Sequence, residues 1–310
     1  MEHLNVSVSP HFFGKRTTQN IMLDVIIALI PALIASVIIF GWRSLLITGV
    51  CTACCILSEY VFRKISKKDN TISDLSAVVT GLLLAFNLPV TIPIWQAIIG
   101  SVTAIIVVKQ LFGGIGQNFA NPAVTARIIM LIAFSGNMTN WTFPQNSVDA
   151  LSGATPLAAA SQGLSSNVNY MTLFLGNHGG CLGETCALAI ILGGIYLLIR
   201  KVITWHIPVA FISTVAAMSF LCGKDTLYQI LSGGLLLAAF FMATDYSTSP
   251  STPWGKIIFG IGCGLITILI RFWGSLPEGV SYSILLMNIL TPYISKLTRQ
   301  KPLGAAGGAK

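Results

Sequence analysis

Residues 21–40 read IMLDVIIALIPALIASVIIF and contain a single charged residue, Asp24. An apolar stretch of this length predicts a helix that spans a membrane, which needs roughly 20 residues. The whole chain of 310 residues follows the same composition, with 54% hydrophobic and only 9% charged residues, whereas a soluble domain has about 25% charged residues. Residues 1–20 lack the apolar core of a signal peptide, so we expect the first stretch to be retained as a span.

Nine further apolar runs follow the first. Together they predict an all-α integral membrane protein of about ten transmembrane helices. The fifth and sixth runs are short for a span, so we expect them to extend into flanking residues or to be broken helices buried among the others. The ten runs are residues 21–40, 44–62, 72–88, 94–112, 122–135, 184–199, 203–222, 226–243, 256–273 and 279–295.

The basic residues predict how the chain is oriented. Cytoplasmic loops of membrane proteins are enriched in Lys and Arg. If the N-terminus is cytoplasmic, the outer segments contain only Arg43, Lys224 and Arg271, and both termini and most basic residues are cytoplasmic. The formal net charge of +8 is therefore explained by the membrane topology and does not indicate nucleic-acid binding. Fourteen of the 18 basic residues are on the cytoplasmic side: Lys15, Arg16, Arg63, Lys64, Lys67, Lys68, Lys109, Arg200, Lys201, Lys256, Lys296, Arg299, Lys301 and Lys310.

Five runs precede a long polar interval and five follow it. An odd number of spans per half makes the halves enter the membrane from opposite sides, which predicts two inverted five-helix repeats. A short match supports the repeat weakly, because Gly81–Ala85 and Gly234–Ala238 have the same five residues. The predicted organisation is a cytoplasmic leader, a first repeat, an extracytoplasmic loop, a second repeat and a cytoplasmic tail, at residues 1–20, 21–135, 136–183, 184–297 and 298–310.

The polar interval contains the sequence DALSGATP, residues 149–156. Asp149, Ser152, Gly153, Ala154 and Thr155 form a pattern that resembles the acceptor at which a flavin transferase joins FMN, through its phosphate, to a threonine hydroxyl. The Thr155 hydroxyl is the atom that would form the phosphoester. The small residues before it give a donor enzyme room to reach the backbone. The alternative is a plain surface turn, since Asp, Ser and Gly all favour turns.

A second polar stretch, FGGIGQNFANPA at residues 112–123, lies before the fifth run. The side chains of Asn118 and Asn121 can hydrogen-bond a planar polar ring, and Pro122 is expected at the first position of a helix. Arg127 follows one turn later. An arginine inside a membrane is costly and usually has a partner, which makes it a candidate functional residue. The alternative is a cytoplasmic hairpin whose arginine reaches out to the lipid surface.

Two more polar stretches flank the second set of runs. Residues 176–185, GNHGGCLGET, lead into the sixth run, where Glu184 is either a helix-terminal residue or part of a cofactor or ion site. Residues 242–250, MATDYSTSP, supply acceptors from Thr244 and Asp245 for a flavin ring or a cation. The alternative is the end of one helix followed by the N-cap of the ninth run. Acidic residues at the membrane edges, Asp24 and Glu59, are further candidates for an ion pathway.

The cysteines and histidines predict no metal site. The seven cysteines lack zinc spacing. Cys51, Cys54 and Cys55 resemble part of an iron–sulfur motif, but four thiolates are normally needed, and we expect these side chains to be buried in a membrane helix. The sequence predicts neither a metal ligand nor a catalytic residue in this chain.

Over residues 10–297 the chain resembles the NqrB/RnfD family of membrane proteins. Its members belong to the Rnf ion-translocating electron-transport complex and to the sodium-pumping NADH:quinone reductase. The likeness rests on several stretches taken together, and the short N-terminal segment is more similar to the Rnf member. These stretches are residues 113–123, 152–156, 180–185, 242–245 and 277–288.

The resemblance implies FMN esterified to Thr155 and a second, non-covalent flavin, riboflavin or a similar molecule, in the helix bundle. It implies a bacterial cytoplasmic (inner) membrane, a flavin transferase, and partner subunits with iron–sulfur centres and flavins. The implied activity is ferredoxin:NAD+ oxidoreduction, with electrons relayed through the two flavins and coupled to movement of Na+ or H+. The protein's part in such chemistry is to hold the flavin and tune its potential.

Two other functions fit the same architecture. One is a channel or secondary transporter for a small polar solute, and the other is a component that only scaffolds its partners. Architecture alone does not decide between them. A transporter has no use for a flavin acceptor on its outer loop, so flavin absorbance in the purified protein separates these alternatives.

Overall fold

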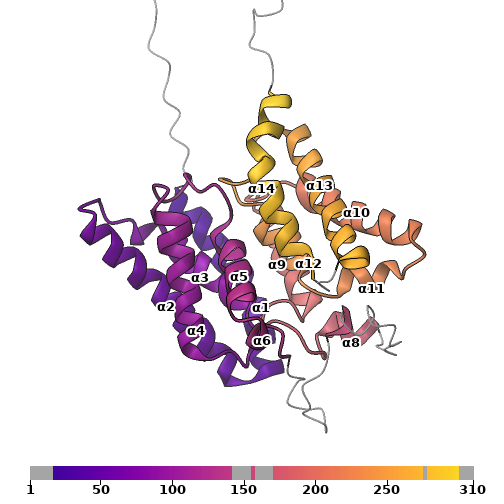
Figure 1. The fold of residues 1–310 in the computed structure, drawn as a ribbon, viewed down its shortest axis with the longest axis horizontal. Coiled ribbons are helices and arrows are strands. Elements are labelled where there is room, and N and C mark those ends of the chain that lie inside the picture. Colours follow the sequence, from indigo (N-terminus) through magenta and orange to yellow (C-terminus); the bar gives the residue numbers. More distant parts are fainter. Residues whose placement is uncertain (1–16, 142–154, 158–169, 275–277, 300–310) are drawn as a thin grey trace, which may run out of the picture.

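The computed structural model describes residues 17–141, 155–157, 170–274 and 278–299, and all regular structure in these ranges is helical. The helices form two groups that lie side by side, one from each half of the sequence (Figure 1). The prediction of an all-α protein is confirmed within the described residues.

The first group contains two long helices and several short ones. The long α1 is capped at its start by Thr17, whose side chain accepts a hydrogen bond from Asn20 N, and at its end by Gly41. Gly41, with a φ of 80°, makes the sharp turn into α2. The elements of this group are α1 (Thr18–Phe40), α2 (Trp42–Ile65), η1 (Ile72–Asp74), α3 (Ser76–Phe86), α4 (Ile94–Val102), η2 (Thr103–Gln110), α5 (Pro122–Ala133) and α6 (Ser135–Met138).

The second group begins after the polar interval. Its longest helix, α13, is capped by Thr252 and has Pro253 at its first position. The elements are α8 (Tyr170–Leu175), α9 (Ala187–Ile199), α10 (His206–Leu221), α11 (Thr226–Leu231), α12 (Leu235–Leu237), η3 (Ala238–Met242), α13 (Pro253–Trp273) and α14 (Val280–Leu297).

Three described helices, α1, α2 and α13, are long and apolar enough to cross a membrane. Their outer faces carry large apolar side chains that the protein does not cover, such as Ile38 at 77% and Leu57 at 59% exposed. In water such a surface would be an aggregation hazard, whereas in a bilayer it contacts lipid tails. The fold is therefore that of a membrane protein.

Each of the ten predicted runs contains helix. The fifth run is a short, mostly buried helix that breaks at Phe134 and continues into α6, as expected, but other runs break as well. The third run starts with a separate 3₁₀ turn because Leu75 adopts a left-handed conformation with φ 59°. The eighth run is interrupted after α11, where Gly233 has a φ of 69°. The sixth run begins its helix at Ala187 rather than at residue 184.

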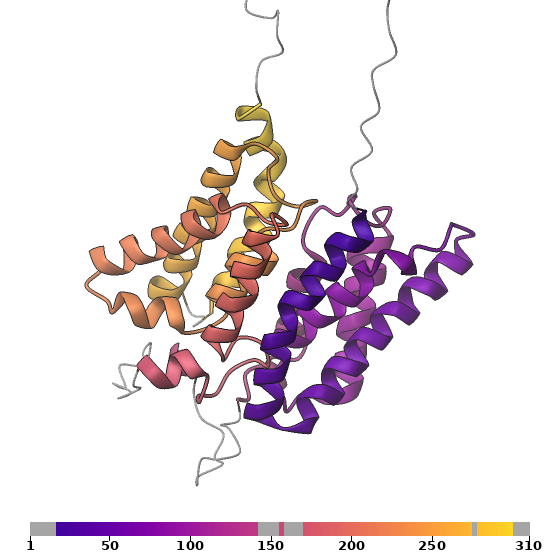
Figure 2. The ribbon, with the colours of Figure 1, turned by 180° about the vertical axis from the view of Figure 1, so that it is seen from behind.

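The two groups pack in corresponding ways. In the first, α2 packs against α3 and α4. In the second, α10 packs against α11 and α13. Between the groups, α1 packs against α9 and α5 against α14. Figure 2 shows α1, in indigo, lying along the boundary with the second group. The start of α1 and the end of α14 lie at one end of the molecule, and α6 and α8 at the other (Figure 1).

The matching five-residue stretches do not occupy equivalent places. Gly81 lies inside α3 against the backbone of Thr52, whereas Gly234 precedes α12 and lies against the Glu184 carboxylate. The shared letters therefore reflect membrane composition, and the correspondence of helix contacts is the better sign of a repeat.

Candidate functional site

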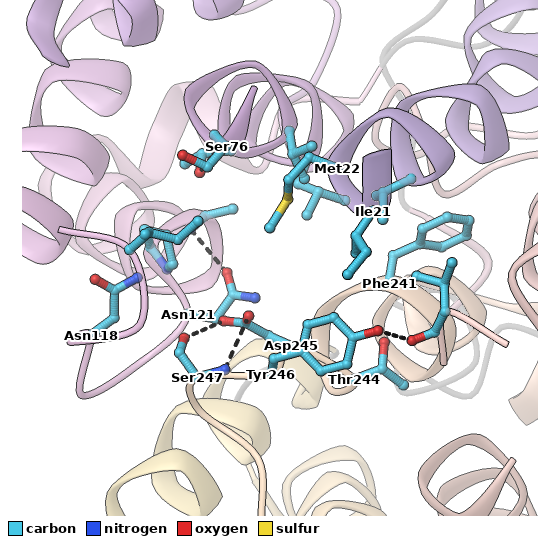
Figure 3. Close-up of a pocket in the computed structure, with 18 of the residues that line it drawn as sticks. Ile21, Met22, Ser76, Asn118, Asn121, Phe241, Thr244, Asp245, Tyr246 and Ser247 are labelled. Carbon is cyan, nitrogen blue, oxygen red and sulfur yellow. Dashed lines mark hydrogen bonds between the residues drawn. The ribbon is translucent and has the colours of Figure 1, made fainter. Parts of the chain in front are cut away.

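A cavity of about 510 Å³ lies between the two groups of helices, at the end of the molecule where α1 begins. Ligand pockets in proteins have volumes of roughly 300–1,000 Å³. Figure 3 shows Ile21 and Met22 on one side of the cavity and Asn118, Asn121, Thr244 and Asp245 among the residues on the other. Four residues that the sequence proposed for a flavin ring thus line one cavity.

The loop before α5 supplies one wall of the cavity. Its glycines at 113, 114 and 116 all have positive φ, which other residues rarely adopt. Asn121 ends the loop as the cap of α5, because its side-chain oxygen accepts hydrogen bonds from Ala123 N and Val124 N. Its amide nitrogen donates to Met242 O at 3.2 Å, which ties the loop to the second group of helices. The prediction that Pro122 begins a helix is confirmed.

The turn after η3 forms the part of the wall beside this loop. The Asp245 carboxylate accepts hydrogen bonds from the Ser247 N–H and from the Ser247 and Thr248 hydroxyls. Burial raises the pKa of this carboxyl, and those hydrogen bonds oppose the rise. The helix that follows is capped by Thr252, and residues 244–247, which lie between the two helices, line the cavity.

A buried ion pair borders the same cavity. Lys109 Nζ lies 2.7 Å from Glu59 Oε2 and 2.7 Å from Ser76 Oγ, and Thr71 donates to the other Glu59 oxygen. Lys109 and Ser76 both line the cavity. The sequence pointed to Glu59 as a membrane-edge carboxylate but not to its partner, because Lys109 lies 50 residues away in the chain.

Arg127 does not line this cavity. It is buried in a separate cluster, where its guanidinium donates to Glu184 at 2.8 Å, to Asn87 at 2.9 Å and to Ser281 at 3.1 Å. A second carboxylate, that of Glu278, pairs with the other guanidinium nitrogen. The expectation that a membrane arginine has a partner is met, and the alternative of an arginine reaching the lipid surface does not hold. The cluster joins α5, α14 and the loop before α9.

Glycine at 234 makes this cluster possible. A Cβ on Gly234 would lie only 2.4 Å from Glu184 Oε1, so a larger residue would displace the carboxylate. The glycine at the break in the eighth run therefore leaves room for the Glu184 carboxylate at the boundary between the two groups of helices. The sequence gives no local signal for the ion pairs of this cluster, because Arg127, Glu184 and Glu278 come from three distant segments.

Thr155 lies in a short described segment that packs on the second group of helices. Thr155 is 4% exposed, and Leu157 is buried beside it. The Tyr228 hydroxyl donates to Pro156 O. The other residues of the predicted acceptor, Asp149, Ser152, Gly153 and Ala154, lie outside the described residues.

Asp24 and the cysteines complete the comparison with the predicted sites. Asp24 accepts hydrogen bonds from Arg200 and Tyr196 at 3.1 Å. Cys51 and Cys55 are buried in α2, as expected, whereas Cys54 is only half-buried. The described residues contain no group of three His, Cys, Asp or Glu side chains that could bind a metal ion.

These features define a helical membrane protein whose two halves enclose a cavity lined by both apolar and polar side chains, and a buried charge cluster. The sequence pattern of the NQR2, RnfD, RnfE family matches residues 5–304. The chain belongs to this family.

Relatives of the chain cover it nearly completely. The D subunit of the Na(+)-translocating ferredoxin:NAD(+) oxidoreductase complex of Acetobacterium woodii is 47% identical over 97% of this chain and 96% of its own length. The D subunit of the proton-translocating complex of Clostridium ljungdahlii is 41% identical over 96% of both chains. The D subunit of the ion-translocating oxidoreductase complex of an Escherichia coli strain is 34% identical over 98% of this chain and 99% of its own.

Proposed function

We propose that this chain is the membrane-embedded RnfD component of an Rnf-type complex, which transfers electrons between ferredoxin and NAD+ and moves Na+ or H+ across the membrane. Full-length relatives at 47% and 41% identity are named as components of such complexes, and they carry the proposal. The apolar outer faces of α1, α2 and α13 place the protein in the bilayer. Other Rnf subunits would supply the iron–sulfur centres and the binding of soluble partners.

The chain's own contribution is to hold two flavins. When bound, a flavin supplies reversible electron and hydride transfer. FMN would be esterified to Thr155 by a flavin transferase that recognises Asp149, Ser152, Gly153 and Ala154. The hydrogen bond from Tyr228 to Pro156 O supports a fixed anchor, because it holds this segment against the helix bundle. A tether of this kind keeps the group in place through repeated cycles.

The second, non-covalent flavin would occupy the cavity between the two groups. The chemistry of the walls fits it: Ile21, Met22 and Val25 offer an apolar surface, whereas Asn118 and Thr244 offer groups that can hydrogen-bond the ring. The buried Asn118 Oδ1 has no hydrogen-bond partner, so a bound ring could satisfy it. Lys109 adds a positive charge to the same wall, held in place by Glu59.

The Arg127 cluster would link the halves mechanically. It joins elements of both groups through one guanidinium and two carboxylates, and such buried networks have discrete arrangements rather than continuous ones. We assign to Arg127 a positioning role between the two halves and not a contact with the flavin in the cavity.

The topology belongs to the same proposal. The two halves would be inverted five-helix repeats with both termini in the cytoplasm, and Thr155 would face the extracytoplasmic side of a bacterial cytoplasmic membrane. The position of α6 and α8 at the end opposite to the start of α1 and the end of α14 supports this arrangement (Figure 1).

In-gel fluorescence tests the attachment. The complex is purified with wild-type chain, with Thr155→Ala, or with Thr139→Ala as a matched control on a described helix end. We expect ultraviolet flavin fluorescence on a denaturing gel from the wild type and the control, and none from Thr155→Ala. Fluorescence that persists in Thr155→Ala would show that the attachment site is wrong. A colourless native protein would favour the transporter or the scaffold instead.

A further inference from the structure

Arg271, in the last turn of α13, is a buried cation without a direct ion pair. It is 6% exposed, and the ion pairs found among the described residues involve Lys109, Arg127 and Arg200 instead. The carboxylates of Glu184 and Glu278 interact with its charge at longer range, but both pair directly with Arg127. A buried charge normally needs a partner, because removing it from water is costly.

Its hydrogen bonds leave the guanidinium incompletely satisfied. One terminal nitrogen donates to Gln229 O at 2.6 Å and to the Gln229 side chain at 3.2 Å, and the other donates to Ser232 O at 3.3 Å. All of these acceptors are neutral. The Nε–H is buried and has no partner. An arginine fixed by neutral carbonyls, with a donor left over, is prepared to bind an anion.

The segment that contains Thr155 lies next to this guanidinium. A Cβ on Gly233 would lie 2.7 Å from Leu157 Cδ1 and 3.3 Å from Arg271 Nη2, so both side chains approach the same point. The Tyr228 hydroxyl binds Pro156 O one residue before Gln229, whose carbonyl holds Arg271. The end of α11 thus binds the Thr155 segment and Arg271 together.

We propose that Arg271 binds the phosphate of the flavin attached to Thr155. The inference rests on the attachment proposed above. A phosphodiester carries one negative charge and unesterified oxygens, which match a guanidinium in charge and in planar hydrogen-bonding geometry. Arg271 is then a positioning residue: it fixes the phosphate end of the tether against α13 and so limits where the ring can move.

The direct test is a solid-state magnetic resonance measurement on the frozen complex, stripped of phospholipid and held in a phosphorus-free detergent, with ¹⁵N-labelled arginine. Dipolar coupling between the phosphodiester ³¹P and guanidinium ¹⁵N appears only when the two groups are in contact. We expect such coupling in the wild type, its loss in Arg271→Lys, and its retention in Arg43→Lys, a control on an exposed arginine of the same predicted membrane side. Arg271→Lys retains a basic side chain at this position.

The outcomes separate the two proposals. A ³¹P phosphodiester signal without coupling in the wild type, or coupling that survives in Arg271→Lys, overturns the role of Arg271 and leaves the attached flavin standing. In that case Arg271 only clamps the end of α11. A wild-type protein with no phosphodiester signal overturns the attachment itself, and the role of Arg271 with it.

Discussion

At the scale of single residues, the buried ion pairs are the contacts that are costly to break. Arg127 is held by Glu184 and Glu278 at the boundary between the helix groups. Removing one partner of a buried pair costs about 3–5 kcal/mol, mainly because the remaining charge is left uncompensated. Two carboxylates depend on this one guanidinium, so its loss should be among the most damaging single changes.

We therefore expect Arg127→Met to destabilise the protein by about 3 kcal/mol. Arg43→Met is the control, because Arg43 is exposed and makes a single long hydrogen bond, 3.4 Å to Thr91 O. Its effect should stay within about 0.5 kcal/mol. Thermal unfolding in detergent measures both variants. Equal stability of the two would mean that the Arg127 cluster contributes nothing to holding the halves together.

The sequence predicted candidate residues better than their partners. Asn118, Asn121, Thr244 and Asp245 were expected from the polarity of two loops, and they line one cavity. Arg127 was expected to need a partner, but its place in a separate cluster was not foreseen. Contacts such as Glu278 with Arg127 join residues 151 positions apart, and no local pattern encodes them.

At the scale of helices, close approach between α1 and α9 depends on a glycine. A Cβ on Gly193 would lie 2.1 Å from the backbone oxygen of Ala28 and 3.0 Å from Phe241. Small residues at such crossings let membrane helices pack backbone to backbone. The contact connects the two groups of helices and forms part of the frame around the cavity.

Gly193→Ala should therefore destabilise the protein by roughly 1–3 kcal/mol, the usual cost of overpacking. Gly49→Ala is the matched control in the middle of α2, where a new Cβ meets nothing within 4 Å. It should be neutral or stabilise by up to about 1 kcal/mol, since Ala favours helix over Gly. Detergent unfolding of the two variants compares them directly. A Gly193→Ala protein as stable as the control would contradict the packing of α1 against α9.

Helix breaks were the least predictable elements. Run length predicted a break in the fifth run, which occurs at Phe134, but it did not predict the breaks of the third run at Leu75 and of the eighth at Gly233. Hydropathy reports average burial in lipid or protein, so it detects that a run is apolar but not that its backbone turns inside it. The Glu184 carboxylate occupies the space that a side chain at residue 234 would need. The reason for a break can therefore lie in a distant residue.

At the scale of the whole molecule, the cavity between the two halves should hold a flavin that can be extracted. Val25 on α1 and the residues around it line the cavity, so Val25→Trp would fill part of its 510 Å³. We expect this variant to lose the flavin released on denaturation and to keep the covalent flavin fluorescence. The control is Val61→Trp, on an exposed face of α2. Undiminished extractable flavin in Val25→Trp would place the second flavin elsewhere.

The orientation of the molecule gives another expected outcome. A periplasmic reporter such as alkaline phosphatase, fused after Asn140, should be active, and the same reporter fused after Thr298 should be inactive. A cytoplasmic reporter should give the opposite pattern, which checks that both fusions are made. An active periplasmic reporter at Thr298 would reverse the predicted topology.

The central claim is that a threonine on the outer side of the membrane carries a flavin, and mass spectrometry of the peptide containing Thr155 tests it most directly. We predict an added mass equal to FMN less one water, with fragments that assign it to Thr155. An unmodified Thr155 in protein purified from its native membrane, or the same mass on a different residue, would contradict the account.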